Sequence, residues 1–272
     1  MDNALYEIYS YLIQQSYPNA TNIRLPGVVG AQKNVLIAEI NGTDHVFKFS
    51  IPDLIKKNQI VSQAYNRHDI PVPKISAKQM DFLFCEEYDI IPGTSLFEAI
   101  RAGIGGDEIR TIYQDVLNAF AKMRRVSLPP KSDSGQLIHA HNFARYHVAN
   151  GQRTTLSELF GAATYLMNIG KQSDIGLYHY DITPKNIILS PDGKFSGLVD
   201  LDSAGICNKN FAFGVMASKY QEIGLDCREL MDYYIDTTSD SLARSRILST
   251  AQINAMAKKM LWKRANAHKR QK

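Results

Sequence analysis

The sequence predicts an α+β protein with two lobes, a small N-terminal lobe with an antiparallel sheet and a larger, mainly helical C-terminal lobe. Three observations lead to this prediction. Short β-like runs separated by turn signals dominate the first 91 residues, and helical periodicity dominates the rest. Between them, Ile91-Pro-Gly-Thr-Ser95 breaks the chain. We therefore expect an N-terminal lobe of residues 1–91 and a C-terminal lobe of residues 92–272.

The elements of the first lobe follow from local patterns. Apolar residues at a 3,4 spacing predict helices over 4–15 and 55–66, and the prolines after Ile70 end the second helix. Asn41-Gly42 is a strong hairpin signal between two of the extended runs. Those runs predict strands at 22–29, 35–40, 45–50 and 82–89.

The second lobe is expected to be helical, with one β-like interruption at 187–199. Helices are predicted over 96–102, 108–126, 155–170 and most of the chain from 211 to the end.

Composition and cysteine usage restrict the class of protein. The chain has 272 residues, 44% hydrophobic and 21% charged, which excludes a disordered chain, a collagen-like chain and a small disulfide-stabilised protein. Its three cysteines form no paired metal-binding signature, and no apolar run approaches the ~18 residues that span a bilayer. The N-terminus carries acids rather than the basic start of a signal peptide, so we expect a cytoplasmic protein without a membrane span.

The formal net charge of +4 comes from one end of the chain. Residues 241–272 hold nine basic and no acidic side chains, which leaves 22 basic and 27 acidic residues, a net charge of −5, in residues 1–240. Because this basic tail lies outside the motif described next, nucleic acid is not an expected partner. The role of the tail stays open between a solvated helix end and contact with nucleic acid or an anionic membrane.

One stretch gathers polar side chains around a predicted hairpin. Pro191-Asp-Gly-Lys194 is a turn sequence between two apolar runs, and Asn186 and Asp200 are equidistant from its centre. A hairpin then brings the backbones of Asn186 and Asp200 to about 5 Å of each other. Asp181 lies in the loop that enters the same end, next to His179.

Carboxylate and amide oxygens suit Mg²⁺, which is usually held by few protein ligands together with phosphate oxygens. An arrangement of this kind leaves Asp181 free to act as a base or to orient a hydroxyl, which is the pattern of a phosphoryl-transfer site. The alternative interpretation is that these residues are caps and turn formers, as polar residues at strand ends often are.

His179-x-Asp181-x4-Asn186, followed by Asp200-Leu-Asp202, resembles the catalytic loop and metal-binding aspartate of the aminoglycoside phosphotransferase and choline kinase superfamily. These are small-molecule kinases that share the protein-kinase fold. The resemblance implies a protein-kinase-like fold and an ATP-dependent phosphotransferase with an alcohol group as acceptor. It implies Asp181 as catalytic base, Asn186 and Asp200 as Mg²⁺ ligands, His179 as a brace for the loop, and Asp202 near the metal.

The resemblance extends in order over residues ~20–235. It implies that Gly30 lies in a phosphate-covering loop, that Lys48 contacts the phosphates of ATP or GTP, and that backbone groups of Asp89 and Ile91 contact the base. The alternative for Lys48 is a solvated strand lysine, since alternation places it opposite the apolar Phe47 and Phe49.

The chain departs from the family pattern at the helix after Lys48, which should supply a glutamate to hold this lysine. Residues 54–68 contain no acidic residue, and Gln59 or Gln63 would have to take the place of the glutamate. This departure keeps a second function open, a kinase-like nucleotide-binding protein with weak or no transferase activity that acts through partners.

Acids and tyrosines mix in the predicted C-terminal helices, which suits a cationic, amine-bearing alcohol through ion pairing and cation–π contacts. The acceptor would then be choline-like, ethanolamine-like or aminoglycoside-like. The alternative is that the tyrosines belong to the core and the acids to a solvated face. The candidate substrate residues are Tyr220, Glu222, Asp226 and Tyr233.

Overall fold

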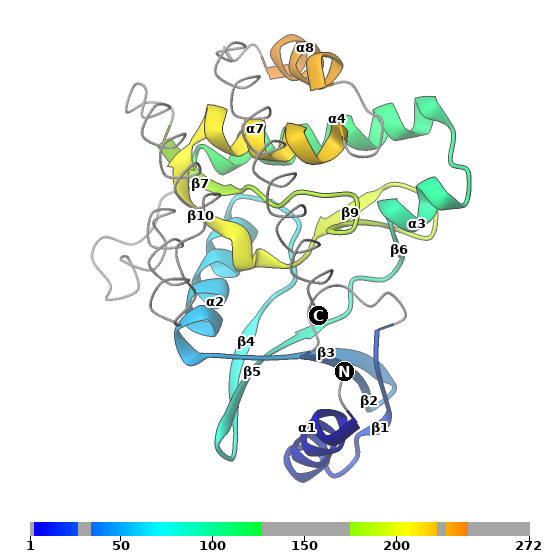
Figure 1. Ribbon diagram of the computed structural model, residues 1–272, viewed down its shortest axis with the longest axis vertical. Helices are drawn as coiled ribbons and strands as arrows, with labels where there is room; N and C mark the ends of the chain where they lie inside the picture. The colour runs from blue at the N-terminus through cyan, green and yellow to red at the C-terminus, as the bar shows by residue number, and fades with distance from the viewer. Residues whose placement is uncertain (1–2, 27–33, 127–174, 222–226, 239–272) are drawn as a thin grey trace, which may run out of the picture.

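A computed structural model describes residues 3–26, 34–126, 175–221 and 227–238. Figure 1 places helix α1 and a five-stranded sheet at one end of the long axis, helices α4, α7 and α8 at the other end, and helix α2 between them. The predicted α+β fold, an antiparallel N-terminal sheet followed by a mainly helical part, is therefore confirmed.

The N-terminal sheet is antiparallel throughout and has the strand order β1-β2-β3-β5-β4. The hairpin between β2 and β3 turns at Asn41 and Gly42, both with positive φ, as the Asn-Gly signal predicts. The strands are β1 (Thr21–Arg24), β2 (Val35–Ile40), β3 (Thr43–Ser50), β4 (Ser76–Met80) and β5 (Leu83–Asp89).

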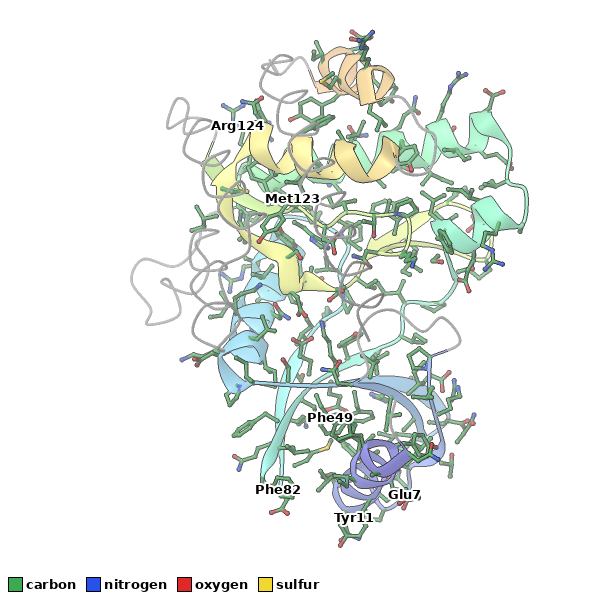
Figure 2. All side chains as sticks on the ribbon, in the orientation of Figure 1. Glu7, Tyr11, Phe49, Phe82, Met123 and Arg124 are labelled. Carbon is green, nitrogen blue, oxygen red and sulfur yellow. The ribbon has the colours of Figure 1, made fainter. Side chains whose placement is uncertain are left out.

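Helix α1 (Asn3–Ser16) covers one face of this sheet. Phe47 and Phe49 of β3 point toward it, and Phe49 stacks on Tyr9 with ring centroids 4.0 Å apart. Figure 2 shows Phe49 against the helix and Tyr11 on the far side, where Tyr11 is exposed. Because strand residues alternate, Lys48 must point to the opposite face, toward the rest of the molecule.

Helix α2 (Pro52–Arg67) lies on that opposite face. Proline at its first position and Asp53 in its first turn favour its start, and the chain leaves it through Asp69, which has a positive φ, before Ile70-Pro71. Its C-terminal half belongs to the larger hydrophobic core, where Tyr65 packs with residues of the second half of the chain.

The second half follows the connection after β5. Its elements are β6 (Thr94–Ser95), α3 (Leu96–Arg101), α4 (Gly106–Met123), β7 (Ile175–His179), β8 (Ile187–Leu189), β9 (Phe195–Leu198), a 3-10 turn (Leu201–Ser203), β10 (Ala204–Asn208), α7 (Lys209–Gln221) and α8 (Cys227–Thr238).

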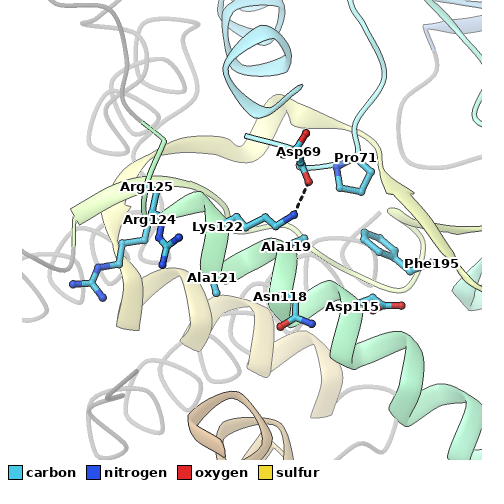
Figure 3. Close-up of a pocket in the computed structure, with 10 residues that line it drawn as sticks. All are labelled: Asp69, Pro71, Asp115, Asn118, Ala119, Ala121, Lys122, Arg124, Arg125 and Phe195. Carbon is cyan, nitrogen blue, oxygen red and sulfur yellow. Dashed lines mark hydrogen bonds between the residues drawn. The ribbon is translucent and has the colours of Figure 1, made fainter. Parts of the chain in front are cut away.

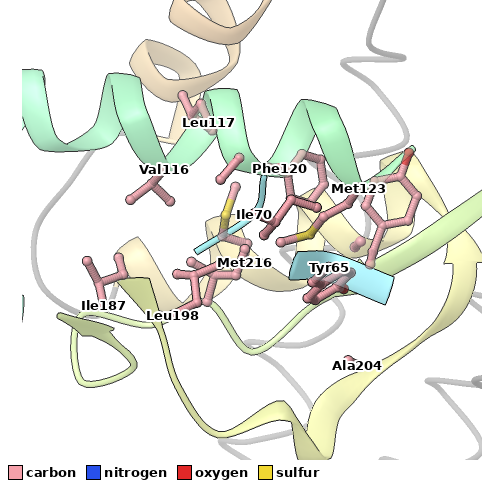
Figure 4. Close-up of a cluster of buried hydrophobic side chains, with 14 of the residues drawn as sticks. Tyr65, Ile70, Val116, Leu117, Phe120, Met123, Ile187, Leu198, Ala204 and Met216 are labelled. Carbon is pink, nitrogen blue, oxygen red and sulfur yellow. The ribbon is translucent and has the colours of Figure 1, made fainter. Parts of the chain in front are cut away.

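The larger core holds these elements together. Figure 4 shows Phe120 and Met123 of α4 above Leu198 of β9 and Met216 of α7, with Tyr65 of α2 beside them. Phe120 also contacts the rings of Tyr178, Phe213 and Tyr234. The hairpin β8–β9 is thus mounted on a packed interior, which fixes the positions of the residues at its open end.

Two parts of the expected secondary structure were wrong by omission. Strand β4 was missed because Ser76-Ala-Lys-Gln-Met80 is an edge strand whose first four residues are exposed, so its sequence has no alternation of apolar and polar residues. Strands β7 and β10 pair with each other, although 187–199 was expected to be the only β-like stretch of the second half. The helix expected over 155–170 and the chain beyond 238 lie outside the described residues.

The connection from β5 to β6 depends on Gly93. This glycine has φ +135°, and a Cβ atom placed on it would lie 1.7 Å from the backbone oxygen of Leu189 in β8. We expect Gly93→Ala to lower the free energy of unfolding by about 3 kcal/mol, since both a forbidden backbone conformation and a clash with backbone must be relieved. Urea unfolding measures the loss.

Gly103→Ala is the matched control. Gly103 also has a positive φ, +88°, but nothing lies within 4 Å of its added Cβ. Gly103→Ala should lower the free energy of unfolding by only about 1 kcal/mol. Equal losses for the two variants would contradict the close approach of Gly93 to β8.

Candidate active site

The β8–β9 hairpin carries the predicted motif at its open end. Its turn has the expected form, with Gly193 at φ +81° and the Ser190 amide donating to the Lys194 oxygen at 2.8 Å. The register differs from the expected one by one residue. Ile187 pairs with Leu198 while Leu189 pairs with Phe195, so the strand accommodates an irregularity.

Because of this shift, Asn186 lies opposite Val199 instead of Asp200, and the Val199 amide donates to the Asn186 oxygen at 3.0 Å. Asp200 comes one residue later and adopts a left-handed conformation, with φ 63° and ψ 64°. Aspartate tolerates this conformation better than most residues. The turn it makes leads directly into the 3-10 turn Leu201–Ser203.

A second pair of strands, β7 and β10, aligns the loop before the hairpin with that turn. His179 at the end of β7 is paired with Ala204 at the start of β10. The His179 ring is buried, and its Nε2 lies 3.1 Å from the Val199 oxygen, which can only accept, so Nε2 carries the hydrogen. His179 therefore holds the residue before Asp200, which is consistent with the brace that the family resemblance implies.

Asp181 and Asn186 are close neighbours in the loop between β7 and β8. The Asn186 side-chain amide donates to the backbone oxygen of Asp181 at 2.9 Å and lies 3.5 Å from its Oδ2. Both side chains are half-buried. The structure thus brings Asp181, Asn186 and the Asp200 turn together beyond the hairpin, as the sequence predicts.

Lys48 reaches the same place from the N-terminal sheet. Its side chain is only 4% exposed, and its Nζ lies 2.7 Å from Asp200 Oδ1 and 2.8 Å from Asp202 Oδ1. Burial alone would lower the pKa of Lys48, but the two aspartates raise it above its ordinary value. The interpretation of Lys48 as a solvated strand lysine was therefore wrong.

Helix α2 contributes hydrogen-bond donors to this cluster. Asn58 donates to Asp202 Oδ1 and to Glu86 Oε1, both at 2.6 Å. Lys57 is buried and donates to the backbone oxygens of Asp202, at 2.6 Å, and Leu201, at 3.2 Å. Helix α2 is thus connected to Lys48 through Asp202, whose Oδ1 accepts from Asn58, and Gln63 is exposed.

Burial sets the protonation of two members of the cluster. Glu86 of β5 lies directly across from Lys48 in the sheet register, and desolvation raises the pKa of its carboxyl to about 7, although Lys48 lowers it. Desolvation lowers the pKa of Lys57 to about 8. Burial would also raise the pKa of Asp202, but Lys48 and the hydrogen bonds from Lys48 and Asn58 lower it overall.

Sequence reasoning missed Lys57, Asn58 and Glu86. A signal was present for Asn58, which lies on the apolar stripe of α2 between Ile55 and Tyr65, where a polar residue has to find a buried partner. Lys57 gave no such signal. Glu86 could have been found from the alternation of β5, which places it on the same face as Lys48 once the register is known.

The other predicted residues are distributed as follows. Asp89 ends β5 with an exposed side chain, and Ile91 lies in the connection to β6, against Gly197 of β9. Tyr233 of α8 packs against the larger core. Gly30, Glu222 and Asp226 lie outside the described residues, as does the side chain of Tyr220 in α7.

The oxygen atoms at the hairpin end fit a hard divalent cation. Asn186 and Asp200 offer an amide and a carboxylate oxygen close to Asp181, and Mg²⁺ needs only one or two protein ligands when phosphate oxygens supply the rest. Among the described residues, no group of three histidine, cysteine, aspartate or glutamate side chains is placed to hold a metal. One amide and one carboxylate oxygen suit a cation that is shared with a phosphate ligand.

A surface hollow of ≈ 660 Å³ lies away from these residues, between α4 and the chain after α2. Figure 3 shows Lys122, Arg124 and Arg125 on its α4 side, and Lys122 Nζ donates to the backbone oxygen of Asp69 at 3.0 Å. Asp115 also lines it. The described lining includes none of the motif residues, so we assign the chemistry to the hairpin end and not to this hollow.

The model of the phosphotransferase enzyme family matches residues 51–208 of the chain, more than half of its length. The matched region begins just before α2 and includes Asp181, Asn186 and Asp200. No curated protein sequence matches the chain. In the part of the chain that is described, no helix is long and apolar enough to cross a membrane.

Solved structures with the same fold include phosphotransferases of aminoglycosides and spectinomycin and a kinase of amicoumacin. The aminoglycoside phosphotransferase APH(3'')-Id from Streptomyces rimosus matches with a TM-score of 0.62 and 13% identity, over 92% of this chain and 98% of that one. The amicoumacin kinase hAmiN, in complex with AMP-PNP, Ca²⁺ and Ami, matches with a TM-score of 0.66 and 14% identity, over 95% and 85% of the two chains. Spectinomycin phosphotransferase APH(9)-Ia, in complex with ADP and spectinomycin, gives 0.61 and 12%, over 92% and 84%.

The raised pKa of Glu86 makes a prediction about stability. A carboxyl whose pKa is about 7 in the folded protein and 4.5 when unfolded contributes stability that is complete below pH 4.5 and is lost as pH rises to 7. Glu86→Gln removes this titration and keeps an acceptor for Asn58. The wild type therefore loses free energy of unfolding relative to Glu86→Gln as pH rises from 4.5 to 7. We expect this relative loss to total about 3 kcal/mol.

The measurement is the free energy of unfolding in urea across this pH range, compared between the two proteins. Glu7→Gln, at an exposed position of α1, is the control and should leave the profile unchanged. Parallel profiles of wild type and Glu86→Gln would show that Glu86 titrates normally.

Proposed function

The chain belongs to the phosphotransferase enzyme family, and from this premise we propose that it is a small-molecule kinase that transfers the γ-phosphoryl group of ATP to a substrate hydroxyl. One observation carries the proposal. The carboxylates and amide of the catalytic-loop motif and a buried lysine from the N-terminal sheet converge at one point, where Lys48 Nζ lies 2.7 Å from Asp200. Positioning and charge stabilisation are what phosphoryl transfer requires of a protein.

Each residue has a role in this proposal. Asp181 accepts the hydrogen of the substrate hydroxyl and orients its oxygen toward the phosphorus, and Asn186 holds the Asp181 loop through its hydrogen bond to the backbone. Lys48 binds phosphate oxygens from the sheet side. Asn186 and Asp200 would hold Mg²⁺, which neutralises charge on the phosphate oxygens when it is bound.

Nucleotide binding is proposed for the space beside β5. Backbone groups of Asp89 and Ile91 would contact the base, and Gly30 would lie over the phosphates. Structures of similar fold contain ADP, GDP or AMP-PNP, and one contains Ca²⁺, which supports a nucleotide and a divalent cation without deciding between ATP and GTP. The division into lobes at residue 91 and a cytoplasmic location remain predictions.

The acceptor is proposed to be a small, amine-bearing alcohol. The structural neighbours named above are phosphotransferases of aminoglycosides and spectinomycin and a kinase of amicoumacin, and the acids and tyrosines of the last helices suit a cation. Tyr220, Glu222, Asp226 and Tyr233 remain the candidates for this contact. Tyr233 is the least favoured, because it packs against the core.

One observation favours a second function, a kinase-like protein that binds nucleotide with weak or no transfer and acts through partners. Helix α2 presents Lys57 and Asn58 to the site where a glutamate is expected. The two functions differ in turnover and agree on nucleotide binding, so a single set of measurements separates them.

Asp181→Asn should reduce kcat at least about a hundredfold, because the amide cannot take up the hydroxyl proton. The dissociation constant of Mg-ATP should stay within about twofold, since Asp181 faces the acceptor in this account. Turnover is measured as ADP release with amino alcohols, aminoglycosides, sugars and nucleosides as acceptors, and binding by calorimetry. Asp192→Asn, in the exposed hairpin turn, is the matched control with unchanged kcat.

Three outcomes separate the possibilities. Turnover retained by Asp181→Asn would remove Asp181 from the role of base. Binding of Mg-ATP without turnover on any acceptor of the panel would favour the second function. A wild-type protein that binds neither Mg-ATP nor Mg-GTP would overturn both.

A further inference from the structure

Lys48 divides its contacts between two carboxylates. Its Nζ lies 2.7 Å from Asp200 Oδ1 and 2.8 Å from Asp202 Oδ1, in a site where the lysine is 4% exposed. The proposed function, on which this inference rests, assigns Asp200 to a divalent cation. A cation bound by Asp200 repels the ammonium of Lys48, so Asp202 is then the carboxylate that remains to hold Lys48 while its Nζ contacts the phosphates.

Helix α2 holds both the side chain and the backbone of Asp202. Asn58 Nδ2 donates to the carboxylate oxygen that also contacts Lys48, and Lys57 Nζ donates to the backbone oxygen of the same residue. Both distances are 2.6 Å. Lys57 and Asn58 are buried neighbours on α2, so they fix Asp202 to the helix.

Glu86 is the other acid beside Lys48. It faces Lys48 across the β3–β5 ladder, but its Oε1 accepts from Asn58, and burial brings its pKa close to neutrality. A carboxyl whose charged form is disfavoured by burial is a weaker counter-ion than Asp202, whose Oδ1 lies 2.8 Å from Lys48 Nζ.

We infer that Asp202 is a positioning residue for Lys48 and not a metal ligand. Helix α2 supplies donors, Lys57 and Asn58, that hold this acid from the turn after Asp200. The acid of the lysine pair therefore comes from the C-terminal half of the chain, and α2 acts on Lys48 through it. The missing glutamate of α2 is then replaced by Asp202 from another part of the chain. Its absence from α2 does not imply loss of activity.

The inference is tested by a double-mutant cycle on nucleotide affinity. Asp202→Asn should weaken binding of Mg-AMP-PNP about tenfold in the wild-type background, since one partner of a buried charge pair is lost. In a Lys48→Met background, Asp202→Asn should weaken binding of Mg-AMP-PNP by less than about twofold. Affinities are measured by calorimetry or, where weak, by thermal shift at millimolar nucleotide.

Metal dependence separates positioning from ligation. The Mg²⁺ concentration for half-maximal nucleotide binding should change less than about twofold in Asp202→Asn and should rise about tenfold in Asp200→Asn. A rise of similar size in both variants would make Asp202 a metal ligand. An equal loss of affinity from Asp202→Asn with and without Lys48 would show that it does not act through Lys48.

Asn58→Ala keeps the charge of Asp202 and removes one of its donors, so it decides the matter if Asp202→Asn does not fold. It should weaken nucleotide binding about threefold, again only when Lys48 is present. Urea unfolding of each variant and the Asp192→Asn control accompany these measurements. A wild type that binds no nucleotide overturns the proposed function and this inference together, whereas an additive cycle in a protein that binds overturns the inference alone.

Discussion

A lysine buried in a protein interior stays charged only if anions lie beside it, and this requirement organises the molecule around Lys48. The anions come from Asp200 and Asp202, the first of them 152 residues further along the chain. The ion pairs therefore join the N-terminal sheet to the turn after the β8–β9 hairpin. Removing either side would leave uncompensated buried charge, so the pairing constrains how the two parts of the chain pack.

The surrounding structure serves to hold that turn. The His179 ring fixes the Val199 oxygen, the β7–β10 ladder aligns the loop that contains Asp181, and Lys57 binds the backbone of the 3-10 turn from α2. These contacts come from three separate elements, and the larger core supports all of them. A rigid arrangement of oppositely charged groups is what positioning and charge stabilisation in phosphoryl transfer need. The fold thus prepares the site before any ligand binds.

The sequence predicted those parts of the structure that local pattern determines. Asn41-Gly42 and the turn around Gly193 located two hairpins, and the spacing of Asp181, Asn186 and Asp200 predicted their convergence. It could not predict partners that depend on tertiary packing. The one-residue shift in β8–β9 moved Asn186 opposite Val199, and the short strands β7 and β10 acquire their pairing only in the folded core. The family pattern places the acid for Lys48 on the next helix, where the sequence has none, and no local rule indicates that a turn of the other half supplies it.

A structure of the protein with AMP-PNP and Mg²⁺ would show directly how Lys48 and the two aspartates share the ligand. We predict that Lys48 Nζ moves from Asp200 to a phosphate oxygen, that it keeps its contact with Asp202, and that Mg²⁺ contacts Asn186 and Asp200. A complex in which the phosphates lie away from Lys48, or in which the metal is bound without Asn186 and Asp200, would contradict this prediction.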